Sequence, residues 1–374
     1  MNNKMEQLNK QLEEIAEQKN TVSMSAAALY KDDVIWTHAL GMSDQENSIE
    51  ATSDTVYRIA SVSKHVSCIA LMTLVEDKLV ELDTDISEYL GYSVRNPYYP
   101  DVPIKLRHLM SHTSTIIERG SYNRIASGEM LPYKLSEVLP EGALGYRKDN
   151  FLNARPGEKY DYSSFGTGIL GAIIERKTGI RFAEYVREKI FIPLNLDASF
   201  DPNDLSKDAD IAVPYEVDEI SEAASKEWLQ KSLENKKKLS ELPLGEAYRI
   251  AQGNLHICAR DLAVIMQIFF FSGKAQGVQI LTPKSVQEMI KPQFIDEHIS
   301  VGFGLNYLDY LMPGLIGHYG RSYGAFTMIV FNHKMQKGVV VLMNGTDPKV
   351  DKRGDNIACK QAALLVYRAI DSII

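Results

Sequence analysis

The sequence is poor in cysteine. Its 374 residues include three cysteines, Cys68, Cys258 and Cys359, which lie far apart and form no C-x-x-C pair. An odd number of isolated cysteines argues against a disulfide framework and against a zinc knuckle. We therefore expect a reducing compartment. No residue pattern elsewhere in the sequence implies a metal or other cofactor.

Long apolar runs and an excess of basic residues are also missing. No segment approaches the roughly 18 uninterrupted apolar residues of a membrane-spanning helix. The first twenty residues are polar and charged, unlike a secretory signal, so we expect a cytoplasmic protein unless an export signal has been removed. Lys and Arg number 41 against 49 Asp and Glu, a net charge of −8 without a visible basic stripe. This balance argues against nucleic-acid binding.

Near both ends of the chain, the spacing of the apolar residues predicts strands together with a helix. Apolar residues recur every three or four positions in the first twenty residues, which predicts an amphipathic helix. Strand-like runs at 23–30 and 34–41 flank a short polar turn, and a second hairpin is predicted from the runs 325–331 and 338–343. A final helix is predicted from about residue 355. Strands that cluster at both termini favour one shared sheet.

Helical patterns dominate the middle of the chain. They cover residues 64–79, 105–112, 168–179 and 182–190, and a charged helix is predicted over 226–239. We therefore predict an α/β (α+β) fold with a mixed or antiparallel sheet formed from both termini, flanked by helices. The predicted units are a discontinuous sheet domain, 1–65 with 250–374, and an inserted all-helical domain, 66–249. We expect the active site in the cleft between them.

Ser61-Val62-Ser63-Lys64 is the one S-x-x-K tetrad of the sequence. A long helical pattern follows it, so Ser61 is predicted at a helix N-terminus and Lys64 one turn later on the same face. A serine hydroxyl becomes a good nucleophile when a neighbouring base takes its proton, and a lysine serves as that base when burial lowers its pKa. Taken alone, the tetrad fits a simple helix cap and a surface lysine better.

Two further segments can present side chains to a cleft. Tyr162 lies in a turn that leads into the helix at 168–179, where a phenol can relay a proton. His318 stands between glycines in Gly317-His318-Tyr319-Gly320, directly before a predicted strand, and glycines there allow a ligand to approach the backbone. The alternatives are a half-buried structural tyrosine and an ordinary turn.

Two rival chemistries have weaker support. Residues 320–324 read G-x-S-x-G around Ser322, but a nucleophile elbow requires a helix after the turn, and a strand pattern follows here. His108 and His112 have i, i+4 spacing without the glutamate of H-E-x-x-H, so we interpret them as structural histidines at a buried helix end.

Taken together, these motifs resemble the serine β-lactamase and penicillin-binding protein superfamily, in particular its class C-like branch. The resemblance covers nearly the whole chain and rests on the order and spacing of several segments. These segments are RIASVSKH, VPIKLRHLMSHTS, PGEKYDYSSFGTGILGAIIERKTG, IFIPLNLDASF, AQGNLHICARDLA, GFGL and GHYG. The branch also includes D-aminopeptidases, carboxylesterases and acyltransferases, and its β-lactamase/transpeptidase-like fold agrees with the one predicted from periodicity.

The resemblance implies roles for individual residues. Ser61 corresponds to the acylated nucleophile, Lys64 to its base partner and Tyr162 to the tyrosine of the Y-x-N element. His318 replaces the lysine of K-T-G, as in members that carry H-x-G. The backbone N–H groups of Ser61 and of Arg321, just after Gly320, correspond to the oxyanion hole.

Four departures from the family pattern bear on substrate choice. Ser164 stands where asparagine is usual, so a shorter hydroxyl replaces an amide that holds the acyl group. Arg321 stands where a small residue is common and offers a guanidinium to an anionic substrate. Thr115 replaces the glycine after SHTS. The missing K-T-G lysine disfavours efficient β-lactam hydrolysis.

These residues predict a serine hydrolase that acts on an amide or ester of a small molecule or short peptide through an acyl-enzyme on Ser61. An acyltransferase that uses the same acyl-enzyme is the nearest alternative. A non-catalytic sensor or scaffold that binds penicillin or peptide is the alternative from another class. The sequence leaves the natural substrate and the oligomeric state open.

Overall fold

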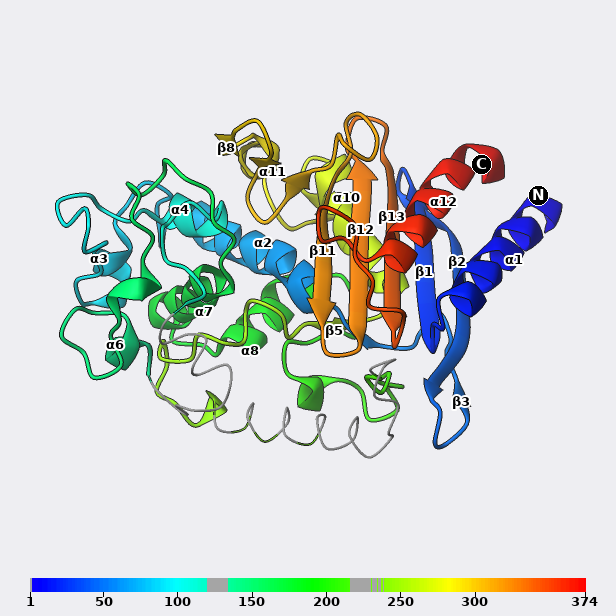
Figure 1. Cartoon of the computed structure of the whole chain (residues 1–374), viewed down its shortest axis with the longest axis horizontal. Helices are drawn as coiled ribbons and strands as arrows, with labels where there is room; N and C mark the ends of the chain where they lie inside the picture. The colour runs from blue at the N-terminus through cyan, green and yellow to red at the C-terminus, as the bar shows by residue number, and fades with distance from the viewer. Residues whose placement is uncertain (1, 120–133, 216–229, 231–233, 235–236, 238) are drawn as a thin grey trace.

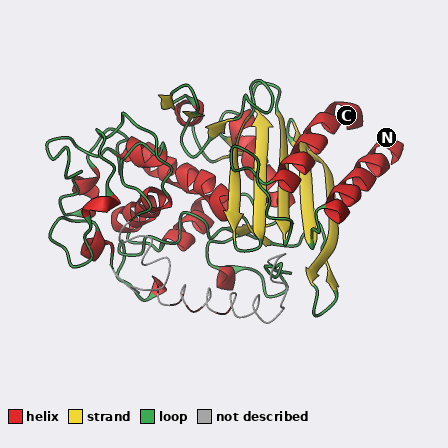
Figure 2. Ribbon diagram, in the orientation of Figure 1, coloured by secondary structure: helices red, strands yellow, loops and turns green. Residues whose placement is uncertain are grey.

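One large antiparallel sheet organises the protein. The computed structural model describes residues 2–119, 134–215, 230, 234, 237 and 239–374. Within them, nine strands pair in the order β3-β2-β1-β13-β12-β11-β10-β9-β8, each antiparallel to its neighbours. The predicted sheet class is therefore confirmed (Figures 1 and 2). The strands are β1 (Ser23–Tyr30), β2 (Asp33–Asp44), β3 (Ile49–Glu50), β8 (Phe294–Ile295), β9 (Ser300–Val301), β10 (Asn306–Tyr307), β11 (Ile316–Ser322), β12 (Ala325–Asn332) and β13 (Lys337–Asn344).

Both ends of the chain contribute to the centre of this sheet. Strand β1 pairs with β13 along its whole length, from the pair Ser23 and Asn344 to the pair Tyr30 and Lys337. The two predicted hairpins, β1 with β2 and β12 with β13, are both present. Two short ladders lie outside the sheet: β4 (Tyr57–Arg58) with β5 (His256–Ile257), and β6 (Lys274–Ala275) with β7 (Val278–Gln279).

The sheet has a hydrophobic core on each face. Alternate residues of β1 separate between the cores, with Ala27 and Leu29 in one and Met24, Ala26 and Ala28 in the other. The second core is closed by α1 (Asn2–Gln18) and α12 (Ile357–Ile373), which contact each other. The first is covered by α10 (Ala259–Phe270) and continues into the helical half of the molecule (Figure 1).

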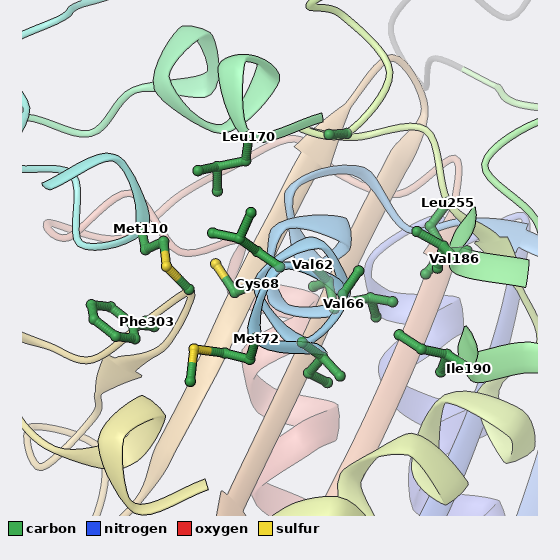
Figure 3. Packing of buried hydrophobic residues seen from close by; sticks show 14 of the residues in the cluster. Val62, Val66, Cys68, Met72, Met110, Leu170, Val186, Ile190, Leu255 and Phe303 are labelled. Atoms are coloured by element: carbon green, nitrogen blue, oxygen red, sulfur yellow. The ribbon is translucent and has the colours of Figure 1, made fainter. Parts of the chain in front are cut away.

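Helix α2 (Ser63–Glu76) is the buried axis of that helical half. Its residues from Ser63 to Thr73 are all buried, and they include the polar side chains of Lys64, His65 and Ser67. Figure 3 shows Val66, Cys68 and Met72 of α2 within a shell of other apolar side chains. The helices and helical turns outside the sheet are η1 (Ala60–Val62), α3 (Ile86–Leu90), α4 (Leu106–Met110), α6 (Leu135–Val138), η2 (Lys148–Asn150), α7 (Ser164–Thr178), α8 (Phe182–Val186), η3 (Arg187–Phe191), η4 (Pro202–Asp204) and α11 (Pro283–Ile290).

Two predicted elements differ from the structure. The helix predicted over 105–112 ends at Met110, and His112 adopts a positive φ of 56°. The segment around His318, predicted as a turn before a strand, is itself the strand β11. Most of the charged helix predicted over 226–239 lies outside the described residues. In the part of the chain that the structure describes, no helix combines the length and the apolar character required to cross a bilayer.

Candidate active site

Ser61 lies in a tight helical turn at the N-terminal end of α2. The turn η1 contains Ala60, whose φ of 47° is a conformation that residues with a side chain rarely adopt. The hydroxyl of Thr327 on β12 donates a hydrogen bond of 2.8 Å to the Ile59 carbonyl and so ties the turn to the sheet. Ser61 itself remains partly exposed and lines a cavity of about 410 Å³.

Lys64 is buried one turn along α2 and is 1% exposed. Its Nζ donates a hydrogen bond of 3.1 Å to Ser61 Oγ and one of 2.8 Å to the Gln252 carbonyl. Burial lowers the pKa of Lys64 to about 7, although the nearby Glu118 carboxylate acts in the opposite direction. Near neutral pH a large fraction of this amine is uncharged, so it can accept the serine proton.

Tyr162 lies beside Lys64 at the cavity that contains Ser61. Its ring centroid lies 4.9 Å from Lys64 Nζ, and the ring also lines the cavity. The next residue, Ser163, caps α7 by accepting a hydrogen bond of 2.9 Å from the Gly166 N–H. The cap fixes where the loop joins the helix, so Tyr162 has a defined position beside Lys64.

His112 also lies beside Tyr162, although the sequence suggested only a structural role. Its ring centroid lies 4.6 Å from that of Tyr162, and its Nδ1 accepts a hydrogen bond of 3.2 Å from the Ser163 N–H. Burial holds the pKa of His112 well below its ordinary value, so the ring is neutral. His108 lies elsewhere, with its Nδ1 accepting from the Lys105 N–H at 3.1 Å, so the two histidines share no helix face. Within the described ranges, no group of three or more His, Cys, Asp or Glu residues could hold a metal ion.

Strand β11 brings His318 and Gly320 to the turn η1 that contains Ser61, which is called the nucleophile turn below. His318 Nδ1 donates a hydrogen bond of 2.8 Å to the Tyr319 carbonyl, and burial lowers the pKa of His318 to about 3. The imidazole is therefore neutral where the K-T-G pattern carries a lysine. A Cβ on Gly320 would lie 2.6 Å from the Ile59 carbonyl and 3.2 Å from the Ser61 nitrogen. The absence of a side chain at Gly320 is what lets β11 approach the turn.

The other two predicted substrate-binding residues occupy different positions. Arg321 is exposed, lines the cavity and has its guanidinium over the Phe326 ring. Ser164 begins α7, and its N–H donates to the Glu118 carboxylate. Among the described residues, the cavity lining includes Arg321 but not Ser164. Glu118 had no recognisable motif in the sequence, and its proximity to Lys64 is visible only in the structure.

The rival serine, Ser322, lies at the end of β11. The chain turns directly into β12 at Ala325, so the helix that a nucleophile elbow requires does not follow. Ser322 Oγ accepts a hydrogen bond of 2.6 Å from the Arg58 guanidinium. A guanidinium in this position cannot act as a base toward the hydroxyl, so the geometry favours Ser61 as the nucleophile.

The cavity beside Ser61 is aromatic and polar. It extends from Ser61 along β10 and β11 to the loop before α12, where Tyr310 donates a hydrogen bond of 2.6 Å to Asp355. The Arg353 guanidinium lies 4.2 Å from the Tyr310 ring centroid. The residues that line the cavity are Ser61, Tyr160, Tyr162, His298, Ile299, Asn306, Tyr307, Leu308, Tyr310, His318, Tyr319, Arg321, Met328, Arg353 and Asp355.

Comparisons with solved structures find the same fold. The chain superposes on the octameric penicillin-binding protein homologue from Pyrococcus abyssi with a TM-score of 0.74 and 22% identity, over 98% of this chain and 77% of that one. It superposes on D-amino acid amidase from Ochrobactrum anthropi SV3 with a TM-score of 0.71 and 21% identity, over 100% and 99%. At these identities the likeness concerns the fold alone.

Sequence comparisons point to the same group of proteins. Penicillin-binding protein 4* of Bacillus subtilis (strain 168) is 22% identical over 202 residues, which span 52% of this chain and 41% of that protein. The human serine beta-lactamase-like protein LACTB, mitochondrial, is 24% identical over 221 residues, spanning 43% and 40%. The chain thus matches about two fifths of the length of these curated relatives. The family described as Beta-lactamase matches residues 7–364, and the chain therefore belongs to the Beta-lactamase family.

Proposed function

We propose that the protein is a serine hydrolase that cleaves an amide or ester through an acyl-enzyme on Ser61. The observation that carries this proposal is the 3.1 Å hydrogen bond between Ser61 Oγ and the buried amine of Lys64. Burial lowers the pKa of Lys64 to about 7 and so provides a base where the nucleophile needs one. The names of the relatives and structural neighbours, which include a D-amino acid amidase, support acyl chemistry of this kind.

Acylation begins with the attack of Ser61 Oγ on the substrate carbonyl carbon. The serine proton moves to the neutral Lys64 amine as the C–O bond forms. The negative charge that develops on the carbonyl oxygen is accepted by the backbone N–H groups of Ser61 and Arg321, which we assign as the oxyanion hole. The tetrahedral intermediate then collapses, the bond to the leaving group breaks, and a proton relayed from Lys64 through Tyr162 reaches that group.

Deacylation repeats the same steps with water. Water attacks the acyl carbonyl, its proton passes to Lys64 or Tyr162, and the bond to Ser61 Oγ breaks as the serine recovers a proton. In this scheme the substrate binds between the sheet unit, residues 1–65 and 250–374, and the helical unit, residues 66–249. The neutral His318 gives no cation at the position of the K-T-G lysine, so penicillin is expected to acylate the protein slowly.

The test is intact-protein mass spectrometry after exposure to a fluorophosphonate, a penicillin and a p-nitrophenyl ester. We expect each probe to form an adduct that peptide mapping places on Ser61, and we expect the ester adduct to clear with time. Ser61→Ala should abolish every adduct, whereas Ser322→Ala should still form its adducts on Ser61. The absence of any adduct on Ser61 would refute the proposal, and an adduct on Ser322 would move the nucleophile there.

A further inference from the structure

Arg58 joins three segments of the candidate active site. It lies on β4, three residues before Ser61, and is partly buried. Its Nη1 donates to Ser322 Oγ at 2.6 Å, its Nε to the Gly253 carbonyl at 3.1 Å and its Nη2 to Asn254 Oδ1 at 3.2 Å. One planar side chain therefore spans the approach to the nucleophile turn, the segment at 252–254 and the end of β11.

Each of these segments carries a group that the proposed reaction uses. The carbonyl that accepts from Lys64 Nζ belongs to Gln252, one residue before Gly253. Ser322 directly follows Arg321, whose N–H we assign to the oxyanion hole. Arg58 itself precedes Ser61 by three residues. The guanidinium thus connects the parts of the chain that hold the base, the oxyanion donor and the nucleophile.

The segment at 252–254 also packs against the nucleophile turn. A Cβ added to Gly253 would lie 3.7 Å from the Ala60 carbonyl, and Ala60 has the positive φ described above. Two serines of α2 hold the same region, since Ser67 Oγ donates to the Ala251 carbonyl at 2.7 Å and the Leu255 N–H donates to Ser63 Oγ at 3.1 Å. The hydrogen bond from Arg58 to Ser322 also connects this region to the end of β11.

We propose that Arg58 is a positioning residue, which fixes the distance between the Lys64 amine and the oxyanion hole by holding Gly253, Asn254 and Ser322 with one rigid fork. The inference rests on the proposed function of Ser61. A planar guanidinium suits the task because its donors point in fixed directions, which a lysine amine cannot reproduce. A displacement of about 1 Å in such a site costs about 10²-fold in rate.

The charge of Arg58 acts in the same direction as its geometry. Burial lowers the pKa of Arg58 to about 10, so the group stays charged at neutral pH. Its positive charge adds, as a smaller contribution, to the lowering of the pKa of Lys64 by burial. Loss of Arg58 would therefore disturb the placement of the proposed base and raise the pKa of Lys64, so that less of the amine is uncharged at neutral pH.

The test compares Arg58→Met, Arg58→Lys and Arg58→Ala with the wild type in single-turnover acylation by a p-nitrophenyl ester. We expect Arg58→Met to lower the acylation rate constant about 10²-fold while KM changes less than about threefold. The acylation rate constant of Arg58→Lys should lie between those of the wild type and Arg58→Met, because lysine keeps the positive charge but lacks the planar set of donors. Guanidinium chloride at low, non-denaturing concentration should restore part of the activity of Arg58→Ala.

Arg95→Met is the matched control. Arg95 is also partly buried, and its guanidinium contacts Asp85 at 2.6 Å and Ser87 Oγ at 2.8 Å within the helical half. Urea unfolding of every variant gives the folded fraction to which the rates are normalised. The inference is wrong if folded Arg58→Met acylates within threefold of the wild type, or if guanidinium restores nothing. Failure of the wild type to acylate at Ser61 would instead refute the proposed function.

Discussion

Lys64 is the residue on whose charge the proposed chemistry depends. It is nearly inaccessible to solvent, yet it contacts Ser61 Oγ and the Tyr162 ring. The two imidazoles nearby, His112 and His318, are kept neutral by burial and so add no fixed charge. The pKa of Lys64 is therefore set mainly by its removal from water.

Acylation is expected to follow the titration of Lys64. The base must be uncharged, so the rate constant should rise about tenfold per pH unit below pH 7 and level off above it. Lys64→Met should lower the plateau rate above pH 7 by about 10²–10⁴-fold and remove the rise in rate through pH 7. Stopped-flow kinetics from pH 5 to pH 9 measure the acylation rate constant of both proteins. A wild-type rate constant that does not change across pH 7 would exclude Lys64 as the base.

The same titration affects folding. The pKa of Lys64 is about 7 in the folded chain, against roughly 10.4 for an unfolded lysine. Between these values the unfolded chain binds a proton that the folded chain does not, so this residue's contribution to the free energy of unfolding rises with pH. The stability advantage of Lys64→Met over the wild type should thus shrink from pH 7 to pH 10 in urea titrations. An advantage that grows with pH would contradict the assignment.

Arg321 is expected to select substrates by charge. Its exposed guanidinium lines the cavity that contains Ser61, where it can pair with a carboxylate. We expect kcat/KM to be about tenfold higher for mono-p-nitrophenyl succinate than for p-nitrophenyl butyrate, and Arg321→Ala to remove the difference. Equal values for both esters in both proteins would show that Arg321 has no such role.

Among the structural elements, those with a long apolar period were predictable and the short ones were not. The sequence predicted a helix over 168–179, which corresponds to most of α7, and Gly179 ends this helix with a φ of 73°. It missed β11, because Gly317 and Gly320 on either side of His318 are of a residue type that is depleted in strands. It also could not show that Thr115 adopts a φ of 68° with its hydroxyl bound by Asn96 at 2.8 Å. Such turns depend on contacts from distant segments.

The approach of β11 to the turn η1 gives a prediction for Gly320. A methyl group there would overlap Thr327 Oγ1 and the Ile59 carbonyl and displace the nucleophile turn. We expect Gly320→Ala to lower the acylation rate about 10²-fold and to reduce the melting temperature. Gly166→Ala in α7 is the control, since its nearest neighbour would be Ser163 Oγ at 3.4 Å. Wild-type acylation by Gly320→Ala would mean that β11 does not constrain the turn.

Across the whole molecule, the two cores have different relations to the site. The first core surrounds α2, the helix that carries Lys64. The second core, under α1 and α12, lies on the other face of the sheet. The sheet built from both termini was predictable from hydrophobic periodicity, and the side chains around Ser61 were named mostly by motif. The domain limits at 65 and 250, and the roles of the site residues, remain predictions.

A substitution of Leu12 tests whether the second core affects stability without affecting the active site. It is fully buried between α1 and the sheet, so Leu12→Ala should lower the free energy of unfolding by about 2–5 kcal/mol. The acylation rate of the folded protein should stay within twofold of the wild type, because Leu12 contacts the second core and Ser61 belongs to the other face. Denaturant titration and single-turnover kinetics on the same sample decide this, and a large rate change would show that the cores are coupled.

The pairing of β1 with β13 also determines when the site can form during synthesis. The residues that fix the nucleophile turn, Thr327 and Gly320, follow Ser61 by more than 250 positions in the chain. Contacts between such distant segments form slowly, and here they require β11 and β12 to have left the ribosome. The nascent chain therefore carries Ser61 and Lys64 without their supporting strands for most of translation. Under the proposed mechanism, acylation becomes possible only when the last strands have joined the sheet.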